Sequence, residues 1–247
     1  MDKNNYTEKE EVEFIQSLYD DATEQLKEVY KEQKKNKDDL LNLIAFIMLT
    51  YTISNNIMSL STSEKAKLNN RFLGIITKIS KGQSILIKDV ITTILTDTVK
   101  RTNNFYGGSF ELKDIEKIVN DKYKGEYFSK RIIKNENDIA KKLYSQTRKF
   151  IQGETDVNTI KSNVDDTFNY DAYTVRRLTE SEVNRTENDS FIIIAKENGI
   201  KKVIRHEILD DRICLDCEAV AEQIFDIADA IDGGLHSLCR GWNSIYE

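Results

Sequence analysis

The motifs CLDC at residues 214–217 and HSLC at residues 236–239 contain every cysteine of the chain and one of its two histidines. Eighteen residues separate the two motifs. A gap of two residues lets one tight turn direct both side chains toward the same ion, and two such turns complete a tetrahedron of thiolates and imidazole. Zn²⁺ prefers such sulfur and nitrogen ligands. The predicted ligands of one zinc ion are Cys214, Cys217, His236 and Cys239.

The predicted zinc site is structural rather than catalytic, because four protein ligands leave no open position for water. The surrounding segment is short and acidic and has few large apolar residues. Metal binding would therefore supply its folding energy. Gly233 and Gly234 give the chain before the second motif the backbone freedom that a turn needs. The alternative interpretation is three buried or free cysteines and a surface histidine.

Most of the sequence before residue 200 predicts helices, because apolar residues recur at three-and-four spacing. The 247-residue chain also contains no proline, which would break a helix. The predicted helices cover residues 6–30, 38–60, 61–81, 83–102, 111–122, 127–152, 156–166 and 170–196. The pattern becomes β-compatible at 203–209 and 241–246. We therefore predict a mainly α fold, with a long-helix N-terminal region followed by a small α+β zinc-knuckle module.

We expect two domains: a helical region at residues 1–110, and a domain at 111–247 whose zinc module covers about 200–247. The first residues have no apolar signal core, so we expect the chain to stay in the cytosol where it is made. Residues 40–53 form the most apolar run. This run falls short of the ~20 apolar residues that span a bilayer, so we expect no membrane partner.

Charge is unevenly distributed along the chain. Residues 203–247 hold three basic and ten acidic side chains, whereas the segment 122–149 holds nine basic and three acidic ones. Aromatic residues are interleaved with these basic residues, and such a mixture can bind phosphates and stack bases. The candidate nucleic-acid contacts are Lys141, Lys142, Arg148 and Lys149. The alternative is an ordinary solvated helix face.

Three segments together resemble a known family. They are DDRICLDC at 210–217, HSLCR at 236–240 and RLTESEVNRTEN at 177–188. They are similar to the signature of phage head morphogenesis proteins, the family of Mu F-type minor head proteins. The resemblance covers residues 127–241, and the two cysteine motifs are its specific part. Glu180, Ser181 and Gly241 depart from the family pattern but leave the four zinc ligands intact.

The resemblance also implies a role for the helix before the zinc module. We expect a buried structural network formed by Glu182, Asn184, Arg185, Asn188, Asp211, Arg212 and Arg240. Glu182 and Arg185 are three residues apart and can share a helix face. The alternative for this pair is an ordinary intrahelical ion pair, which contributes only a few tenths of a kcal/mol.

By resemblance, the chain is expected to be a minor structural and assembly protein of a tailed-phage or prophage head. It would be located in the virion, at the portal vertex and capsid interior. Its expected partners are the portal protein, the major capsid or scaffolding protein, and packaged DNA. No nucleophile–base pair or phosphate loop stands out, so we expect no enzyme activity. The alternative function is a zinc-stabilised nucleic-acid-binding protein without a virion role.

Overall fold

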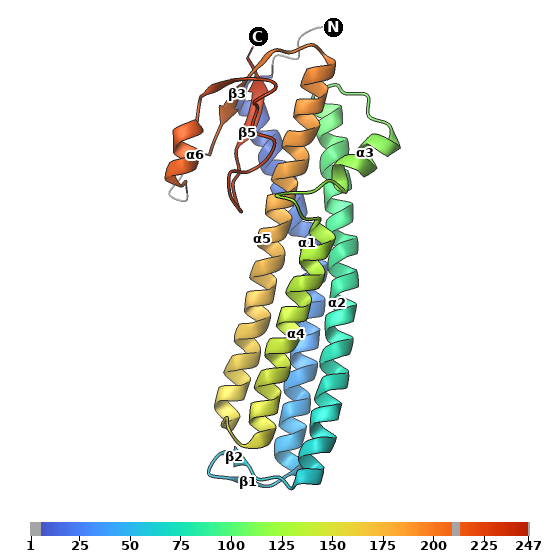
Figure 1. Ribbon diagram of the computed structural model, residues 1–247, viewed down its shortest axis with the longest axis vertical. Helices are drawn as coiled ribbons and strands as arrows, with labels where there is room; N and C mark the ends of the chain where they lie inside the picture. Colours follow the sequence, from blue (N-terminus) through green and yellow to red (C-terminus); the bar gives the residue numbers. More distant parts are fainter. Residues whose placement is uncertain (1–5, 209–212, 247) are drawn as a thin grey trace. The chain divides into compact units, whose positions relative to one another are not determined.

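The computed structural model describes residues 6–208 and 213–246, and within these ranges the protein is mainly helical (Figure 1). The helices are α1 (Glu8–Thr50), α2 (Thr62–Phe105), α3 (Leu112–Val119), α4 (Phe128–Gln152), α5 (Val157–Glu197) and α6 (Leu215–Val220). The strands are β1 (Ile53–Ser54), β2 (Ile57–Met58), β3 (Lys202–His206), β4 (Ile224–Asp226) and β5 (Trp242–Ile245). The prediction of a mainly α chain with a small C-terminal sheet is confirmed. No helix in the described part of the chain is both long enough and apolar enough to cross a membrane.

Three helices are longer than the sequence predicts. α1 continues through residues 31–37, α2 continues through Gly82, and α5 continues through residues 166–170. The predicted helix ends at these three places are wrong. Lys, Glu and Gln at 31–37 are good helix formers, and a single glycine costs a helix only about 1 kcal/mol. Packing of the neighbouring apolar residues outweighs such local costs.

A short hairpin replaces the predicted end of the second helix. β1 and β2 pair antiparallel, with Ile53 opposite Met58. Asn55 and Asn56 form the two-residue turn with φ of 52° and 62°. This left-handed conformation at both central positions is the one that tight hairpins need and that asparagine tolerates.

The chain forms two compact units, neither of which is continuous in sequence. The first, here called the bundle unit, contains residues 26–89 and 129–175. The second, the site unit, contains residues 1–25, 90–128 and 176–247. The helices α1, α2 and α5 each contribute to both units.

The bundle unit is built from two helical hairpins. One joins α1 to α2 through β1 and β2, and the other joins α4 to α5 through a short turn (Figure 1). Its core is apolar and includes Ile47, Phe72, Leu143, Phe150 and Val164, which are at most 1% exposed. Gly153 ends α4 with φ of 80°, a conformation that favours glycine at helix C-termini.

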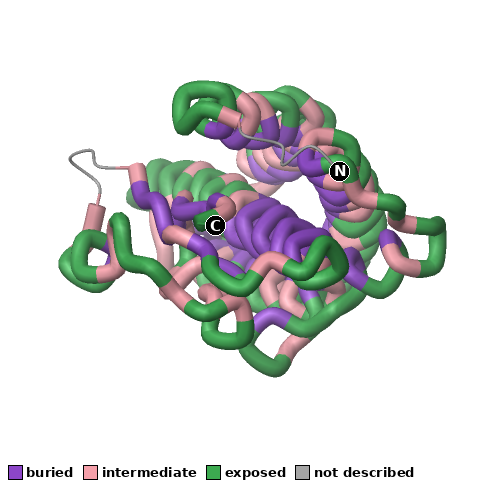
Figure 2. Tube along the Cα trace, turned by 90° about the horizontal axis from the view of Figure 1, so that it is seen from above, coloured by how far each residue is buried: buried purple, intermediate pink, exposed green. Residues whose placement is uncertain are grey.

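The site unit packs the last part of α5 against a three-stranded antiparallel sheet of order β4-β3-β5. Every residue from 181 to 195 is buried except Asp189 and Ile193, which are half-buried; buried residues are purple in Figure 2. An aromatic cluster covers the end of this core, with Phe14 stacked on Phe105 at 4.1 Å between ring centroids. Because this part of α5 is buried all round, its many polar residues must find partners inside the protein.

Candidate metal centre

Three of the four predicted ligands meet at the start of α6. Cys214 lies at the N-cap of this helix in extended conformation, so Cys217 follows within the first turn. The Sγ atoms of Cys214 and Cys217 lie 3.0 and 3.1 Å from Nε2 of His236. The other ring nitrogen, Nδ1, is 2.8 Å from the carbonyl of Ser237. A proton on Nδ1 donated to this carbonyl leaves Nε2 free to bind a metal.

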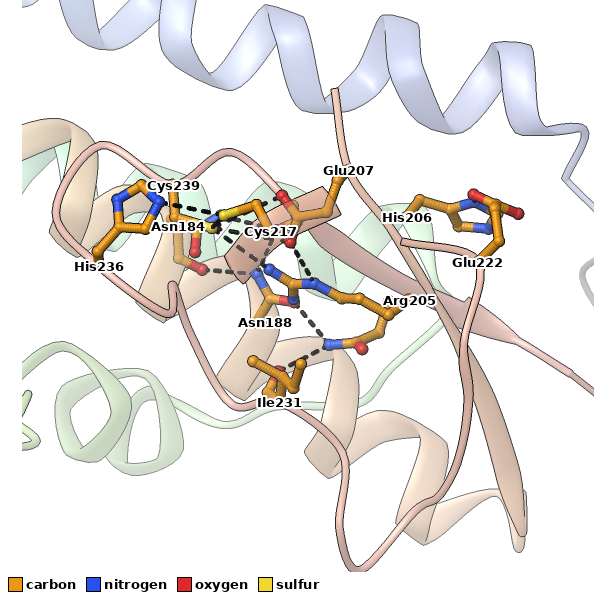
Figure 3. Close-up of polar contacts among 12 residues, drawn as sticks. Asn184, Asn188, Arg205, His206, Glu207, Cys217, Glu222, Ile231, His236 and Cys239 are labelled. Carbon is orange, nitrogen blue, oxygen red and sulfur yellow. Dashed lines mark hydrogen bonds and ion pairs between the residues drawn. The ribbon is translucent and has the colours of Figure 1, made fainter. Parts of the chain in front are cut away.

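Cys239 joins the group through Cys217, whose Sγ is 3.5 Å from the Sγ of Cys239 (Figure 3). Leu238 has φ of 68°, and the amide of Cys239 donates to the carbonyl of His236 at 3.3 Å. The second motif is thus a tight turn, as its spacing predicts. The hydroxyl of Ser181 on α5 accepts a hydrogen bond from the amide of Leu238 at 3.2 Å and anchors this turn.

The donor set fits one small cation. Zinc bonds of about 2.3 Å to sulfur and about 2.0 Å to nitrogen place tetrahedral ligand atoms about 3.5–3.8 Å apart. The distances above are slightly shorter, so a small outward movement of the side chains would admit an ion. A cavity of about 20 Å³ lies among Cys214, Cys217, His236 and Cys239. The cluster of three cysteines and a histidine can therefore hold a metal ion.

Glu207 is a further metal-binding candidate that the sequence interpretation missed. Its carboxylate oxygens lie 3.6 and 3.7 Å from the Sγ of Cys239. Glu207, Cys217 and Cys239 form a second close group of ligand atoms, which shares Cys217 with the group of Cys214 and His236. A carboxylate is a weaker choice than the imidazole for a site rich in thiolates. Glu207 also accepts a hydrogen bond from Arg205.

Arg205 connects the sulfur cluster to α5 (Figure 3). Its guanidinium is fully buried and donates to Glu207 at 2.9 Å and to the Oδ1 of Asn188 at 3.1 Å. Its Nη2 lies 3.7 Å from the Sγ of Cys239. A buried guanidinium at this position would offset the negative charge of a metal site built from several thiolates. Arg205 lies on β3 and Glu207 directly follows this strand, and the two-residue spacing alone does not identify them as neighbours of the cysteines.

The protonation of the candidate ligands depends on their local contacts. The pKa of the Cys214 thiol is lowered, mainly by the backbone amide of Cys217. The pKa of the Cys217 thiol is raised, first by burial and then by the neighbouring Cys239. The pKa of His236 is raised, mainly by its hydrogen bond to the Ser237 carbonyl. Because Cys217 and His236 hold their protons more strongly than usual, metal binding would release protons from this site.

Asn184 and Asn188 lie in the α5 segment that carries the resemblance, and they bind the backbone next to the second cysteine motif. The Nδ2 atoms of Asn184 and Asn188 donate to the carbonyl of Gly241, at 2.8 and 3.2 Å. Asn188 Oδ1 also accepts a hydrogen bond from Asn243 at 2.7 Å. A side chain at position 241 would overlap the carboxylate of Glu207, so this close approach needs glycine.

Glu182 and Arg185 form a buried ion pair with 2.8 Å between Nε and Oε2. Arg185 also donates to the carbonyl of Ile118 in α3 and to Asp189, at 2.9 and 2.8 Å. Burial raises the pKa of Asp189 to about 7, and Arg185 counteracts this shift. With exposed fractions of 2% and 0%, Arg185 and Glu182 differ from an ordinary surface pair.

Of the three remaining predicted network residues, the structure describes only Arg240. Asp211 and Arg212 fall outside the described residues. Arg240 lines the small cavity beside the cysteines and is half-buried. The structure thus places five of the seven residues, namely Glu182, Asn184, Arg185, Asn188 and Arg240, in the site unit.

The candidate nucleic-acid contacts belong to the bundle unit rather than to the site unit. Lys141, Lys142, Arg148 and Lys149 are all exposed on α4. Lys141 forms an ion pair with Asp138 at 3.2 Å, and the Lys142 ammonium lies 5.5 Å from the centre of the Tyr170 ring. These positions leave all four cations accessible to solvent.

Comparison with known proteins adds no relative. The chain matches no family profile, no curated protein and no solved structure.

Proposed function

We propose that this chain is a non-enzymatic structural and assembly protein of a tailed-phage or prophage head, stabilised by one zinc ion. The observation that carries the proposal is how the two cysteine motifs and the α5 segment that also carries the resemblance lie in space. The cysteine motifs converge at one small cavity, and the helix with Glu182, Asn184, Arg185 and Asn188 binds the backbone beside it. These are the segments on which the resemblance to Mu F-type minor head proteins depends.

Zinc is the metal that this donor set favours. Three thiolates and one imidazole are soft and borderline ligands, which select zinc over oxygen-loving Mg²⁺ or Ca²⁺. When bound, zinc would join the turn at Cys214 and Cys217 to the turn at His236 and Cys239. Arg205 and Asn188 would connect this junction to α5, so that the metal stabilises the whole site unit. A four-ligand set that surrounds a cavity of about 20 Å³ supports a structural role rather than a catalytic one.

The helical N-terminal region, residues 1–110, is our candidate for binding the portal protein, with the major capsid or scaffolding protein as further partners. Exposed apolar side chains support a contact surface there. Phe46 and Leu49 lie three residues apart on α1 and are 54% and 89% exposed. We propose a location at the portal vertex and capsid interior, after synthesis in the host cytoplasm.

Quantitative mass spectrometry of purified particles tests the virion role. We expect the chain at a few to a few tens of copies per head, together with the portal protein. A chain with Phe46→Ser and Leu49→Ser should fold but enter particles in lower amounts. A matched chain with the exposed Lys9→Ser substitution should enter particles normally. Absence of the wild-type chain from particles, despite abundant protein in the lysate, would overturn the proposed function.

A second candidate function is nucleic-acid binding without a virion role. The four exposed cations of α4 favour it, because exposed Lys and Arg can release counterions from phosphates. If they bind DNA, changing Lys141, Lys142, Arg148 and Lys149 to Gln should flatten the salt dependence of binding. The slope of log K against log salt should fall by about 0.9 for each lost phosphate contact. Unchanged binding, or none at low salt, would remove this candidate.

A further inference from the structure

A buried polar layer crosses the core of the bundle unit. Each of its four helical segments contributes one buried residue, namely Gln33 from α1, Gln83 from α2, Glu136 from α4 and Asp171 from α5. Their exposed fractions are 3%, 1%, 1% and 0%. Charged and amide side chains in an apolar core are costly unless partners compensate them.

The contacts within this layer bring the two carboxyl groups together. Gln33 Nε2 donates to Asp171 Oδ2 at 2.8 Å. After burial, the neighbouring Asp171 carboxyl raises the pKa of Glu136. A hydrogen bond between the two carboxyl groups would require a proton on one of them, because two ionised carboxylates can only accept. Ser80, one turn before Gln83 on α2, donates to the Glu136 carbonyl at 3.2 Å.

The layer has too few donors for its acceptors. Five buried oxygens have no donor among the described residues: Gln33 Oε1, Gln83 Oε1, Asp171 Oδ1 and both carboxylate oxygens of Glu136. The only unpartnered nitrogen donor of these four side chains is Gln83 Nε2. One shared proton pairs two carboxyl oxygens at most. The amide oxygen of Gln33 is also held in place, because its Nε2 is bonded to Asp171.

We infer that this layer is a binding site for one hard divalent cation, Ca²⁺ or Mg²⁺. Both ions bind oxygen ligands only, and carboxylates with amide oxygens are ligands that Ca²⁺ accepts. Two carboxylates would balance the double charge of the ion, and the amide oxygen of Gln33, whose Nε2 is bonded to Asp171, would add an uncharged oxygen ligand. The cation would thereby supply the positive charge that these oxygens lack. The site is independent of the cysteine cluster, because thiolates select softer metals.

Ion binding to the full-length, zinc-loaded protein tests this inference. After removal of free Ca²⁺ and Mg²⁺, equilibrium dialysis against each ion with elemental analysis should find one additional ion per chain. The melting temperature should rise with millimolar Ca²⁺ or Mg²⁺, because the ion binds only the folded state. Glu136→Gln and Asp171→Asn should each abolish both effects. Asp138→Asn, an exposed acidic residue on the same helix, is the matched control and should retain them.

Two results would overturn the inference. The first is that the wild-type chain takes up no ion besides zinc and its melting temperature does not respond to Ca²⁺ or Mg²⁺. The carboxyl pair would then be held by a shared proton alone. The second is that Glu136→Gln binds the ion as well as wild type, which would place bound ions on the acidic surface. Because the first result needs no variant, the test stays decisive even if a substitution disturbs folding.

Discussion

Single residues at the candidate metal centre are tightly constrained by their surroundings. A Cβ atom added to Gly234 would lie 2.7 Å from the Cβ of Cys239 and 2.9 Å from the carbonyl of His236. These atoms belong to two candidate ligands and cannot both move away without opening the site. Gly82 on α2 is the opposite case, because an added Cβ there meets nothing within 4 Å.

Gly234→Ala should therefore weaken zinc binding about tenfold or more and destabilise the site unit by about 1–3 kcal/mol, the usual cost of overpacking. Chelator competition and urea unfolding measure the two effects. Gly82→Ala, the matched control, should leave zinc affinity unchanged and stabilise the chain by up to about 1 kcal/mol. Zinc affinity of Gly234→Ala equal to that of wild type would refute the assigned ligand geometry.

Removing Arg185 should be far more costly than removing a surface cation. Arg185→Ala removes the guanidinium that is ion-paired with the fully buried Glu182 carboxylate, and it should lower the free energy of unfolding by about 3–5 kcal/mol. Lys9→Ala, which breaks an exposed pair with Glu13, should cost less than about 1 kcal/mol. Urea unfolding of both variants makes the comparison. Similar small costs would mean that Arg185 forms only an ordinary intrahelical pair.

At the residue scale, sequence reasoning identified the cysteine and histidine cluster because all cysteines lie in two motifs with metal-ligand spacing. It missed Arg205 and Glu207, since their partners on α5 and in the second motif are far away in the chain. Only the folded chain brings them beside Cys239. Long-range polar contacts of this kind leave no local periodicity in the sequence.

At the scale of elements, the helices follow from apolar spacing, but their lengths do not. Sequence reasoning took the polar run 31–37, Gly82 and residues 166–170 as breaks, yet each lies inside a continuous helix. Tertiary packing overrides such weak local signals. The polar run even includes Gln33, which is buried against Asp171. The β1–β2 hairpin did have a local signal, the pair Asn55-Asn56, which favours a two-residue turn.

The bundle unit should lose stability as pH rises. Burial and Asp171 raise the pKa of Glu136 to about 9 from an ordinary value of 4.5. Between these values the folded chain keeps a proton that the unfolded chain has released. The free energy of unfolding therefore falls with pH, by up to about 1.4 kcal/mol per unit for one proton. The stability that the Glu136 proton contributes is complete below pH 4.5 and is lost as the pH rises through 9.

Glu136→Gln removes this proton linkage and should make the pH dependence shallower between pH 5 and 9. Urea unfolding at several pH values, without added Ca²⁺ or Mg²⁺, measures the slope. Some slope should remain, because burial also raises the pKa of Asp171 to about 6 and that of Glu187 to about 8. The exposed Asp138→Asn should keep the wild-type slope. Identical slopes in Glu136→Gln and wild type would contradict the assignment.

At the scale of the whole molecule, the two compact units have different sources of stability. The bundle unit has an apolar core and contains no cysteine. The site unit packs a small sheet and many buried polar residues around the candidate metal ligands. It also contains the only tryptophan, Trp242, which is 3% exposed and stacks on His206. Tryptophan fluorescence therefore reports on the site unit alone.

Loss of the metal should unfold the site unit selectively. Replacing Cys214 and Cys217 with Ser should shift Trp242 fluorescence to longer wavelength, while circular dichroism retains much of the helical signal. Treatment of the wild-type chain with a strong chelator should have the same effect, which separates metal loss from an effect of the substitutions. A double variant that melts like wild type, with unchanged metal content, would rule out the metal site.

The most direct test of the central claim is zinc-edge X-ray absorption on the purified full-length chain, with the zinc content measured on the same sample. We expect one zinc per chain, coordinated by three sulfurs at about 2.3 Å and one nitrogen at about 2.0 Å. This result would assign Cys214, Cys217, His236 and Cys239 as the ligands. A chain without zinc, or a coordination shell in which an oxygen replaces one of these ligands, would contradict the assigned zinc site.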